Sequence, residues 1–394
     1  MILSKRSVVL ILFSVLVLNT ASIGLVIYLP RYLDIYLKIE KPVIQLVMTI
    51  FPLTLFVFPP LLGKISDKIQ NRILFIIIGA FGAVLSFILF LFTQNLFLIV
   101  ILSLLYGFFG AAFRTIFTLY AELVDNDTRY ISYYNAVSTC GWFLGSQLGG
   151  IFIDVYGIQN IFLFLILFST INLGFVFFIR ENRTLILSHY ENTTDEHNND
   201  INGVNIISVS VYLGLFFRNF GIKPIMVVLA IIMSFHISSI TQVGFLIGLN
   251  FLIQVALMLL IGHIISEKNE KSILIFGYLF SMIAIIGYII SNSFFSFLIS
   301  QIFIAFSYSM FWSATVMYIT QNSTPRNKGR YMGYANSFTF SGGFAGGLLF
   351  SYLLVLFNSN YNSVMFFMIV FPLISALSIL FKFKPKSKQK PIIK

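Results

Sequence analysis

The chain has 394 residues, of which 58% are hydrophobic, 17% aromatic and only 10% charged, and its mean hydropathy is +0.93. About a quarter of the residues of a typical soluble protein are charged, so this composition excludes a water-soluble globular protein and indicates an integral membrane protein. The single cysteine, Cys140, excludes an intrachain disulfide framework and a zinc cluster. Because Cys140 lies in an apolar run, we expect a small buried thiol.

Twelve segments are apolar enough, and close enough to the roughly 20 residues that a helix needs, to cross a bilayer. Only helices and closed barrels satisfy their backbone hydrogen bonds in lipid, and runs such as 73–91 lack the alternation of barrel strands. We therefore predict an all-α membrane protein with twelve transmembrane helices. The predicted spans are 8–30, 42–62, 73–94, 96–124, 131–155, 160–179, 205–233, 239–265, 272–291, 294–321, 331–357 and 363–381.

The basic residues predict the orientation of these spans. Lys and Arg are enriched in cytoplasmic loops, and 19 of the 25 fall on one side if the amino terminus is inside. We therefore expect a multi-pass protein of the cell membrane with both termini in the cytoplasm. The basic tail 382–394 is interpreted as an orientation determinant near anionic lipid headgroups, not as a nucleic-acid-binding segment. The 19 residues are Lys5, Arg6, Lys64, Lys68, Arg72, Arg129, Arg180, Arg183, Lys268, Lys271, Arg326, Lys328, Arg330, Lys382, Lys384, Lys386, Lys388, Lys390 and Lys394.

An internal repeat divides the chain into two halves. Residues 129–135 match residues 330–336 at an offset of 201, which also pairs Gly141 with Gly342 and Gly145 with Gly346. A polar segment, 181–203, separates the halves and is typical of a flexible cytoplasmic linker. We predict two pseudo-symmetric six-helix bundles, 1–180 and 204–381, with a solute site between them near the membrane midplane.

The motif Gly63-Lys-Ile-Ser-Asp-Lys-Ile-Gln-Asn-Arg72 resembles the signature of the major facilitator superfamily, and the resemblance covers essentially the whole chain. It implies a carrier that works by alternating access. An acid and several bases in a tight turn suit a cytoplasmic latch between the bundles, although the same bases would also serve merely to set topology in a solvated loop. The candidate gating residues of both halves are Gly63, Asp67, Lys68, Arg72, Glu267, Lys268, Arg129 and Arg330.

Residues 141–150 resemble the fifth-helix motif of that superfamily, which is often associated with export by proton antiport. Ser146 stands where the family has proline, and Ser103 stands where it has a fourth-helix arginine, so the resemblance supports proton coupling only in part. Small residues at helical spacing let helices approach closely in membranes. The predicted packing positions are Gly141, Gly145, Gly149, Gly150, Gly342 and Gly346.

Arg114 and Arg218 fall deep within predicted spans, where a charge costs about 2.5–3.5 kcal/mol on the lenient insertion scale. A guanidinium group suits a carboxylate or phosphate, so both arginines are candidates for binding an anionic solute; the alternative is a structural charge bonded to backbone or water. Lys223 lies about 140° around the helix from Arg218 and is a weaker candidate. The other candidate binding residues are Asn19, Asn219, Gln301, Tyr308 and Trp312.

No acidic residue falls at midspan, and Glu122 is the candidate proton relay at a membrane edge. The sequence therefore favours a secondary active or facilitative carrier for a small, anionic organic solute, with a drug or lipophilic-solute/proton antiporter as the alternative. A receptor or assembly protein with the same fold is the alternative of another class. We expect a monomer without enzyme activity, cofactor or metal. Its expected partners are the bilayer and a small solute, and a co-transported or exchanged ion is left open. No nucleic-acid partner is expected.

Overall fold

The computed structural model describes residues 2–69, 71–124, 128–180, 207–323 and 325–383. Side chains are not described at 2–5, 67, 128, 129, 325–328 and 382, although these residues lie in helices. The predicted linker 181–203 and the tail beyond residue 383 lie outside the described residues. So do the side chains of Asp67 and Arg129, two of the candidate gating residues.

Within these ranges, twelve helices are long and apolar enough to cross a membrane, which confirms the predicted fold class. The helices are α1 (Ile2–Arg31), α2 (Lys41–Met48), α3 (Ile50–Ile69), α4 (Arg72–Leu91), α5 (Leu96–Phe113), α6 (Thr115–Leu123), α7 (Thr128–Tyr156), α8 (Ile161–Phe177), α10 (Val209–Ser234), α11 (Ile240–Ile264), α12 (Glu270–Ile290), α13 (Phe294–Gln321), α14 (Pro325–Leu356), α15 (Tyr361–Met368) and α16 (Val370–Lys382). Three spans consist of two helices each: α2 with α3, α5 with α6, and α15 with α16.

The boundaries differ from the predicted ones mainly where helices continue past the apolar segment. The first span reaches Tyr36, because a π-helical turn follows α1. The seventh span is the continuous helix α10 despite Arg218, Lys223 and the internal Pro224. A proline within a membrane helix is tolerated because neighbouring helices and local adjustments satisfy the freed backbone carbonyl.

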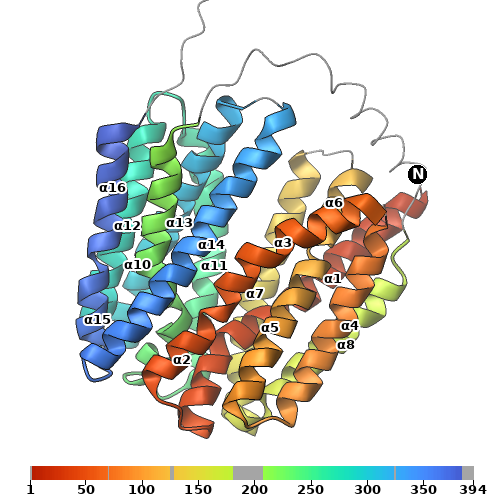
Figure 1. The fold of residues 1–394 in the computed structure, drawn as a ribbon, viewed down its shortest axis with the longest axis horizontal. Coiled ribbons are helices and arrows are strands. Elements are labelled where there is room, and N and C mark those ends of the chain that lie inside the picture. Colours follow the sequence, from red (N-terminus) through yellow and green to blue (C-terminus); the bar gives the residue numbers. More distant parts are fainter. Residues whose placement is uncertain (1, 70, 125–127, 181–206, 324, 384–394) are drawn as a thin grey trace, which may run out of the picture.

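The helices form two groups, which pack mainly within themselves (Figure 1). In the N-terminal group, α1 packs on α7 and α8, and α4 packs on α5 and α8; in the C-terminal group, α10 packs on α14 and α16, and α12 packs on α13. We call the end that carries Arg6 and Phe383 the proximal end and the opposite end the distal end. The groups contact each other through α7 with α11, α14 with α2 and α3, and α1 with α10.

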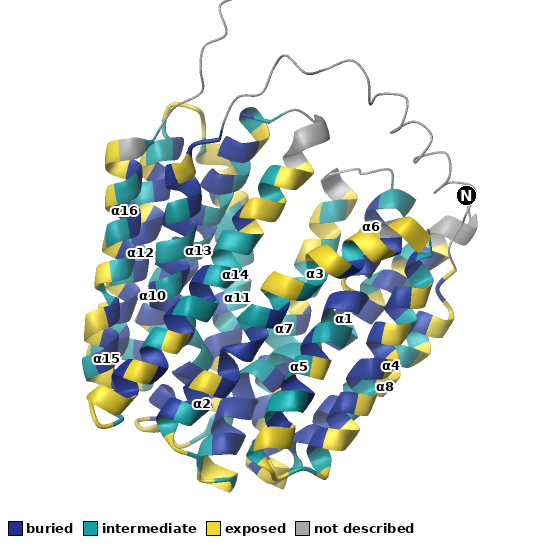
Figure 2. Cartoon of the chain, viewed as in Figure 1, coloured by how far each residue is buried: buried dark blue, intermediate teal, exposed yellow. Residues whose placement is uncertain are grey.

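Exposed residues cover the outward sides of the helices, and buried residues lie where helices meet (Figure 2). Many exposed side chains are large and apolar, such as Phe92 (81% exposed), Phe295 (73%) and Phe381 (76%). Large apolar surfaces of this kind would be unfavourable in water, and they suit contact with lipid.

Candidate substrate-binding site

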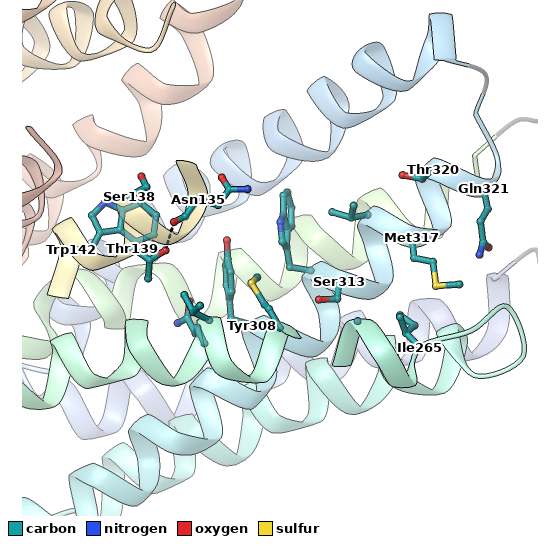
Figure 3. Close-up of a pocket in the computed structure, with 16 residues that line it drawn as sticks. Asn135, Ser138, Thr139, Trp142, Ile265, Tyr308, Ser313, Met317, Thr320 and Gln321 are labelled. Carbon is teal, nitrogen blue, oxygen red and sulfur yellow. Dashed lines mark hydrogen bonds between the residues drawn. The ribbon is translucent and has the colours of Figure 1, made fainter. Parts of the chain in front are cut away.

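A cavity of about 700 Å³ lies between α7 of the N-terminal group and α11 and α13 of the C-terminal group (Figure 3). It extends to Ile265 and Gln321, at the proximal ends of α11 and α13. Its volume is in the range of small-molecule sites. The lining residues are Asn135, Ser138, Thr139, Trp142, Gln254, Val255, Met258, Gly262, Ile265, Tyr308, Trp312, Ser313, Val316, Met317, Thr320 and Gln321.

The cavity wall combines aromatic rings with uncharged polar groups. Tyr308 and Trp312, both predicted from the sequence, stack with ring centroids 6.3 Å apart. Trp142 lines the cavity from α7 (Figure 3). Such rings offer a flat apolar surface with a polar edge, while the hydroxyl and amide groups of Ser138 and Gln254 can hydrogen-bond a solute.

Arg114 occupies the break between α5 and α6, and its side chain is exposed although it lies within a membrane span. Tyr106 and Tyr134 lie close enough to interact with its charge. The hydroxyl of Tyr106 donates a 2.8 Å hydrogen bond to Ser22 Oγ, which holds the ring in place. Arg114 therefore combines a position within a membrane span with residue-level exposure.

Lys223 approaches Arg114 from the other group of helices. It lies on α10, is half-buried, and is close enough to Arg114 for their charges to interact. Its Cβ lies 3.4 Å from the position that a Cβ of Gly343 would take, and Pro52 lies 3.5 Å from the same point. Because Pro52 belongs to α3 and Gly343 to α14, the Lys223 side chain begins at the boundary between the two groups.

Arg218 has a different environment from Arg114. Its side chain is 3% exposed. It donates hydrogen bonds to Ser281 Oγ (3.0 Å), Asn219 Oδ1 (3.2 Å) and Ser307 Oγ (3.4 Å), and its guanidinium carbon lies 4.3 Å from the centroid of the Phe311 ring. All of these partners belong to the C-terminal group, so Arg218 ties α10 to α12 and α13.

Of the remaining candidate binding residues, Asn19 contacts a cavity residue, whereas Asn219 and Gln301 lie away from the cavity lining. Asn19 Nδ2 donates a 2.6 Å hydrogen bond to Ser138 Oγ, so Asn19 stands directly behind a cavity residue. Asn219 Nδ2 bonds the Leu215 carbonyl at 2.7 Å within α10. Gln301 is fully buried and does not line the cavity. Asn219 and Gln301 are therefore not among the residues that line the cavity.

The candidate gating residue Arg72 contacts Glu122, the candidate proton relay. Arg72 Nη2 lies 2.6 Å from Glu122 Oε1, and Nε lies 2.9 Å from Oε2. The two side chains are 6% and 17% exposed. This pair joins α4 to α6 within one group and does not cross to the other group. Gly63 borders open space, and Lys68, Glu267, Lys268 and Arg330 are exposed.

The six candidate packing glycines all lie against a neighbouring helix. A Cβ at Gly141 would lie 2.6 Å from the Leu16 carbonyl oxygen, and one at Gly149 would lie 2.6 Å from the Tyr28 ring. The repeat is visible in these contacts, because Gly141 and Gly145 of α7 face α1 while Gly342 and Gly346 of α14 face α10. Gly150 differs, since it faces the Ile240 carbonyl oxygen of the other group at 2.8 Å.

Two features of α7 differ from the sequence expectation or were missed by it. Cys140 is exposed, not buried; an apolar run in a membrane helix faces lipid as readily as protein, so it does not predict burial. Asn135, Ser138, Thr139 and Trp142 recur at the spacing of one helix face, and they line the cavity. A helical-wheel plot of residues 135–142 would have shown this polar face.

Twelve apolar helices around a cavity that reaches one end of the bundle define a multi-pass membrane carrier. The sequence pattern of the Major Facilitator Superfamily matches residues 9–192 and 211–394, so the chain belongs to this superfamily. The protein is accordingly a transporter of a small-molecule solute, and not an enzyme.

Similar proteins agree with this assignment. The chain is 25% identical over 334 residues to an uncharacterized MFS-type transporter of Methanocaldococcus jannaschii, covering 80% of this chain and 84% of that one. It is 25% identical over 156 residues to the class H tetracycline resistance protein of Pasteurella multocida, which spans 38% of each chain. A crystal structure of an auto-inhibited POT family peptide transporter superposes with a TM-score of 0.80 at 13% identity, covering 98% of this chain and 99% of that one.

Proposed function

We propose that the protein is a secondary carrier of small organic anions, which bind between Arg114 and Lys223 and against the aromatic wall of the cavity. The two helix groups would rock about this site by alternating access. The described conformation, with contacts at the distal end and a cavity that reaches the proximal end, would be the state open to the cytoplasm. Both termini would be cytoplasmic, in the cell membrane, and the carrier would act as a monomer.

The observation that carries this proposal is the pair of cations from opposite groups. Arg114 and Lys223 lie within membrane spans and within reach of each other's charge. Each cation is costly at this depth, and their mutual repulsion opposes closure of the groups around an empty site. A carboxylate or phosphate between them would be attracted by both charges, and the Arg114 fork would bind it through two hydrogen bonds.

The positions of the acidic residues favour exchange or facilitated diffusion over proton coupling. Among the 16 cavity-lining residues there is no Asp, Glu or His, and Glu122 is engaged by Arg72. A proton-coupled carrier needs a titratable group that meets the solute pathway. The cavity lining supplies no relay for a proton, whereas Arg114 and Lys223, which are not among the lining residues, would supply the cations for an anion.

The test is counterflow uptake by the purified protein in liposomes, with benzoate, phthalate and succinate as probes and tetraphenylphosphonium as the cationic control. We expect Arg114→Gln and Lys223→Gln each to reduce anion exchange at least tenfold. Arg180→Gln removes the same charge from an exposed position three residues beyond α8 and should leave exchange unchanged. Exchange at the wild-type rate in both the Arg114→Gln and the Lys223→Gln variants would refute the anion site.

Drug or lipophilic-solute efflux by proton antiport is the second candidate function. The cavity lining favours this function, because it contains Trp142, Tyr308 and Trp312 and no charged side chain. The similarity of part of the chain to a tetracycline resistance protein also favours it. Under this alternative, a pH gradient drives uptake of a lipophilic solute, and that uptake survives Arg114→Gln. The same liposomes therefore distinguish the two functions.

A further inference from the structure

The distal end contains a carboxylate that spans the two helix groups. Asp154, at the end of α7, accepts hydrogen bonds from Ser239 Oγ (3.0 Å), Ile240 N (3.1 Å) and Thr241 N (2.8 Å). These groups form the first turn of α11, so Asp154 caps a helix of the opposite group. A carboxylate is favourable there because the unpaired amides and the helix dipole carry partial positive charge.

The backbones of α7 and α11 approach closely next to this cap. A Cβ at Gly150 would lie 2.8 Å from the Ile240 carbonyl oxygen, and Gly244 of α11 lies directly against the Ser146 carbonyl of α7. The cap and the close approach depend on each other, because Asp154 is one helical turn beyond Gly150. Both must be lost together when the groups separate at this end.

Arg31, at the end of α1, lies beside Asp154 in the same group. Its side chain is 8% exposed, and its Nε and Nη1 atoms are buried without a hydrogen-bond partner among the residues that the structure describes. Asp34 and Asp154 are both close enough to interact with its charge. A buried guanidinium group with unpaired nitrogens is unfavourable, so the described state leaves this cation incompletely bonded.

Arg31 and Asp154 keep their proximity when the groups move apart, because α1 and α7 pack against each other within the N-terminal group. The Tyr28 ring and hydroxyl, one turn before Arg31, lie against Gly149 and Gly150, so the two helices are in register here. Movement of α11 away from α7 would release Asp154 from its three hydrogen bonds. Arg31, whose Nε and Nη1 atoms are unbonded within the described part of the chain and whose charge already interacts with Asp154, is then available as a donor in the same group.

We propose that Asp154 is a two-position switch: it caps α11 when the distal end is closed and pairs with Arg31 when the distal end is open. The bonds to the first turn of α11 exist only in the closed state, and the pair with Arg31 exists only in the open state. The Arg31 pair therefore offsets the loss of the bonds to α11 and lowers the free-energy cost of opening. The inference rests on the proposed alternating-access movement but not on the identity of the solute. Asp34 is the competing partner for Arg31.

The switch can be tested by double electron–electron resonance, which measures distances between spin labels, on the full chain in lipid nanodiscs. Spin labels at Gln159→Cys and Asn292→Cys, in a Cys140→Ser background, place one exposed distal label on each group. The measured quantity is the ratio of open to closed distal populations. Ser239→Ala removes a bond that exists only in the closed state and should raise this ratio about threefold.

Arg31→Gln removes the open-state partner and should lower the ratio about tenfold, which corresponds to about 1.4 kcal/mol. In an Asp154→Asn background the same substitution should change the ratio less than twofold, whereas in an Asp34→Asn background the full effect should persist. Arg31→Lys keeps the charge and should restore most of the open population, which separates the switch from a folding defect.

An unchanged ratio for Arg31→Gln, or an equal effect with and without the Asp154 carboxylate, would overturn the switch. A single closed distance in both the wild type and Ser239→Ala would contradict the alternating-access proposal and the switch together. Two populations whose ratio is the same in the wild type and in Arg31→Gln would contradict the switch alone.

Discussion

Replacement of Glu122 by glutamine would distinguish a structural role of this residue from a proton-relay role. The substitution keeps the size of the side chain but removes the carboxylate that contacts Arg72 Nη2 at 2.6 Å and Nε at 2.9 Å. Arg72 is 6% exposed and Glu122 is 17% exposed, so little solvent is available to replace the lost partner. The variant therefore removes the Glu122 carboxylate from a largely buried arginine.

Loss of one partner from a buried ion pair costs about 3–5 kcal/mol. The lower end applies here because Glu122 is not fully buried, so we expect the free energy of unfolding to fall by about 3 kcal/mol, roughly a hundredfold in the unfolding equilibrium. The assay is equilibrium unfolding in mixed micelles, for Glu122→Gln, Arg72→Gln and the double variant. We expect the double variant to be less destabilised than the sum of the two, with a coupling of at least about 1.5 kcal/mol.

A loss below about 0.5 kcal/mol, the usual range of a surface substitution, would refute the structural reasoning. The relay role makes a separate prediction. If Glu122 carries protons, Glu122→Gln abolishes uptake driven by a pH gradient and leaves exchange intact in protein that is still folded.

Three further substitutions follow from the packing and the cavity. Gly346→Ala adds a methyl group against the Phe220 carbonyl and should destabilise the protein by about 1–3 kcal/mol in the same unfolding assay; a neutral result would contradict the close contact. Gly110→Ala is its matched control, because a Cβ there meets nothing within 4 Å, and it should be neutral or slightly stabilising. Trp312→Ala removes a ring that stacks on Tyr308 at 6.3 Å and should weaken benzoate binding about three- to tenfold, or about 0.5–1.5 kcal/mol, while succinate binding stays unchanged; equal losses for both probes would indicate a general packing defect.

The number and approximate position of the spans could be predicted because crossing a bilayer imposes a length and an apolar composition on each segment. The ends were less predictable. Helices extend beyond the hydrocarbon region wherever capping and packing permit, as α1 does with its turn to Tyr36. Lys223 and Pro224 interrupt the apolar pattern of the seventh span, yet α10 is continuous.

The direction in which each polar side chain points could not be predicted. In a soluble protein, the polar face of a helix identifies the solvent side. In a membrane helix, the lipid side and the protein side are both apolar, so depth along the helix can be calculated but rotation about its axis cannot. Arg218 and Lys223 illustrate this point: both are deep in α10, but Arg218 bonds Ser281 within its own group while Lys223 meets the boundary with α3.

The distal contacts were also beyond reach of the sequence. Asp154 and Arg31 are 123 positions apart, and each lies near the end of a predicted span, with no sequence pattern that links the two. Only the close approach of α7 to α11 brings Asp154 to the first turn of a helix in the other group. The repeat pairs Gly141 and Gly145 with Gly342 and Gly346, and the first pair lies against α1 while the second lies against α10.

The most direct test of the anion site is equilibrium binding of phthalate and benzoate to the purified protein by isothermal titration calorimetry. We predict that Arg114→Gln and Lys223→Gln each weaken phthalate binding at least tenfold, and that the double variant shows no binding. Arg180→Gln should match the wild type. Phthalate affinity that is unchanged in the Arg114→Gln and Lys223→Gln variants would contradict an anion site between the two helix groups.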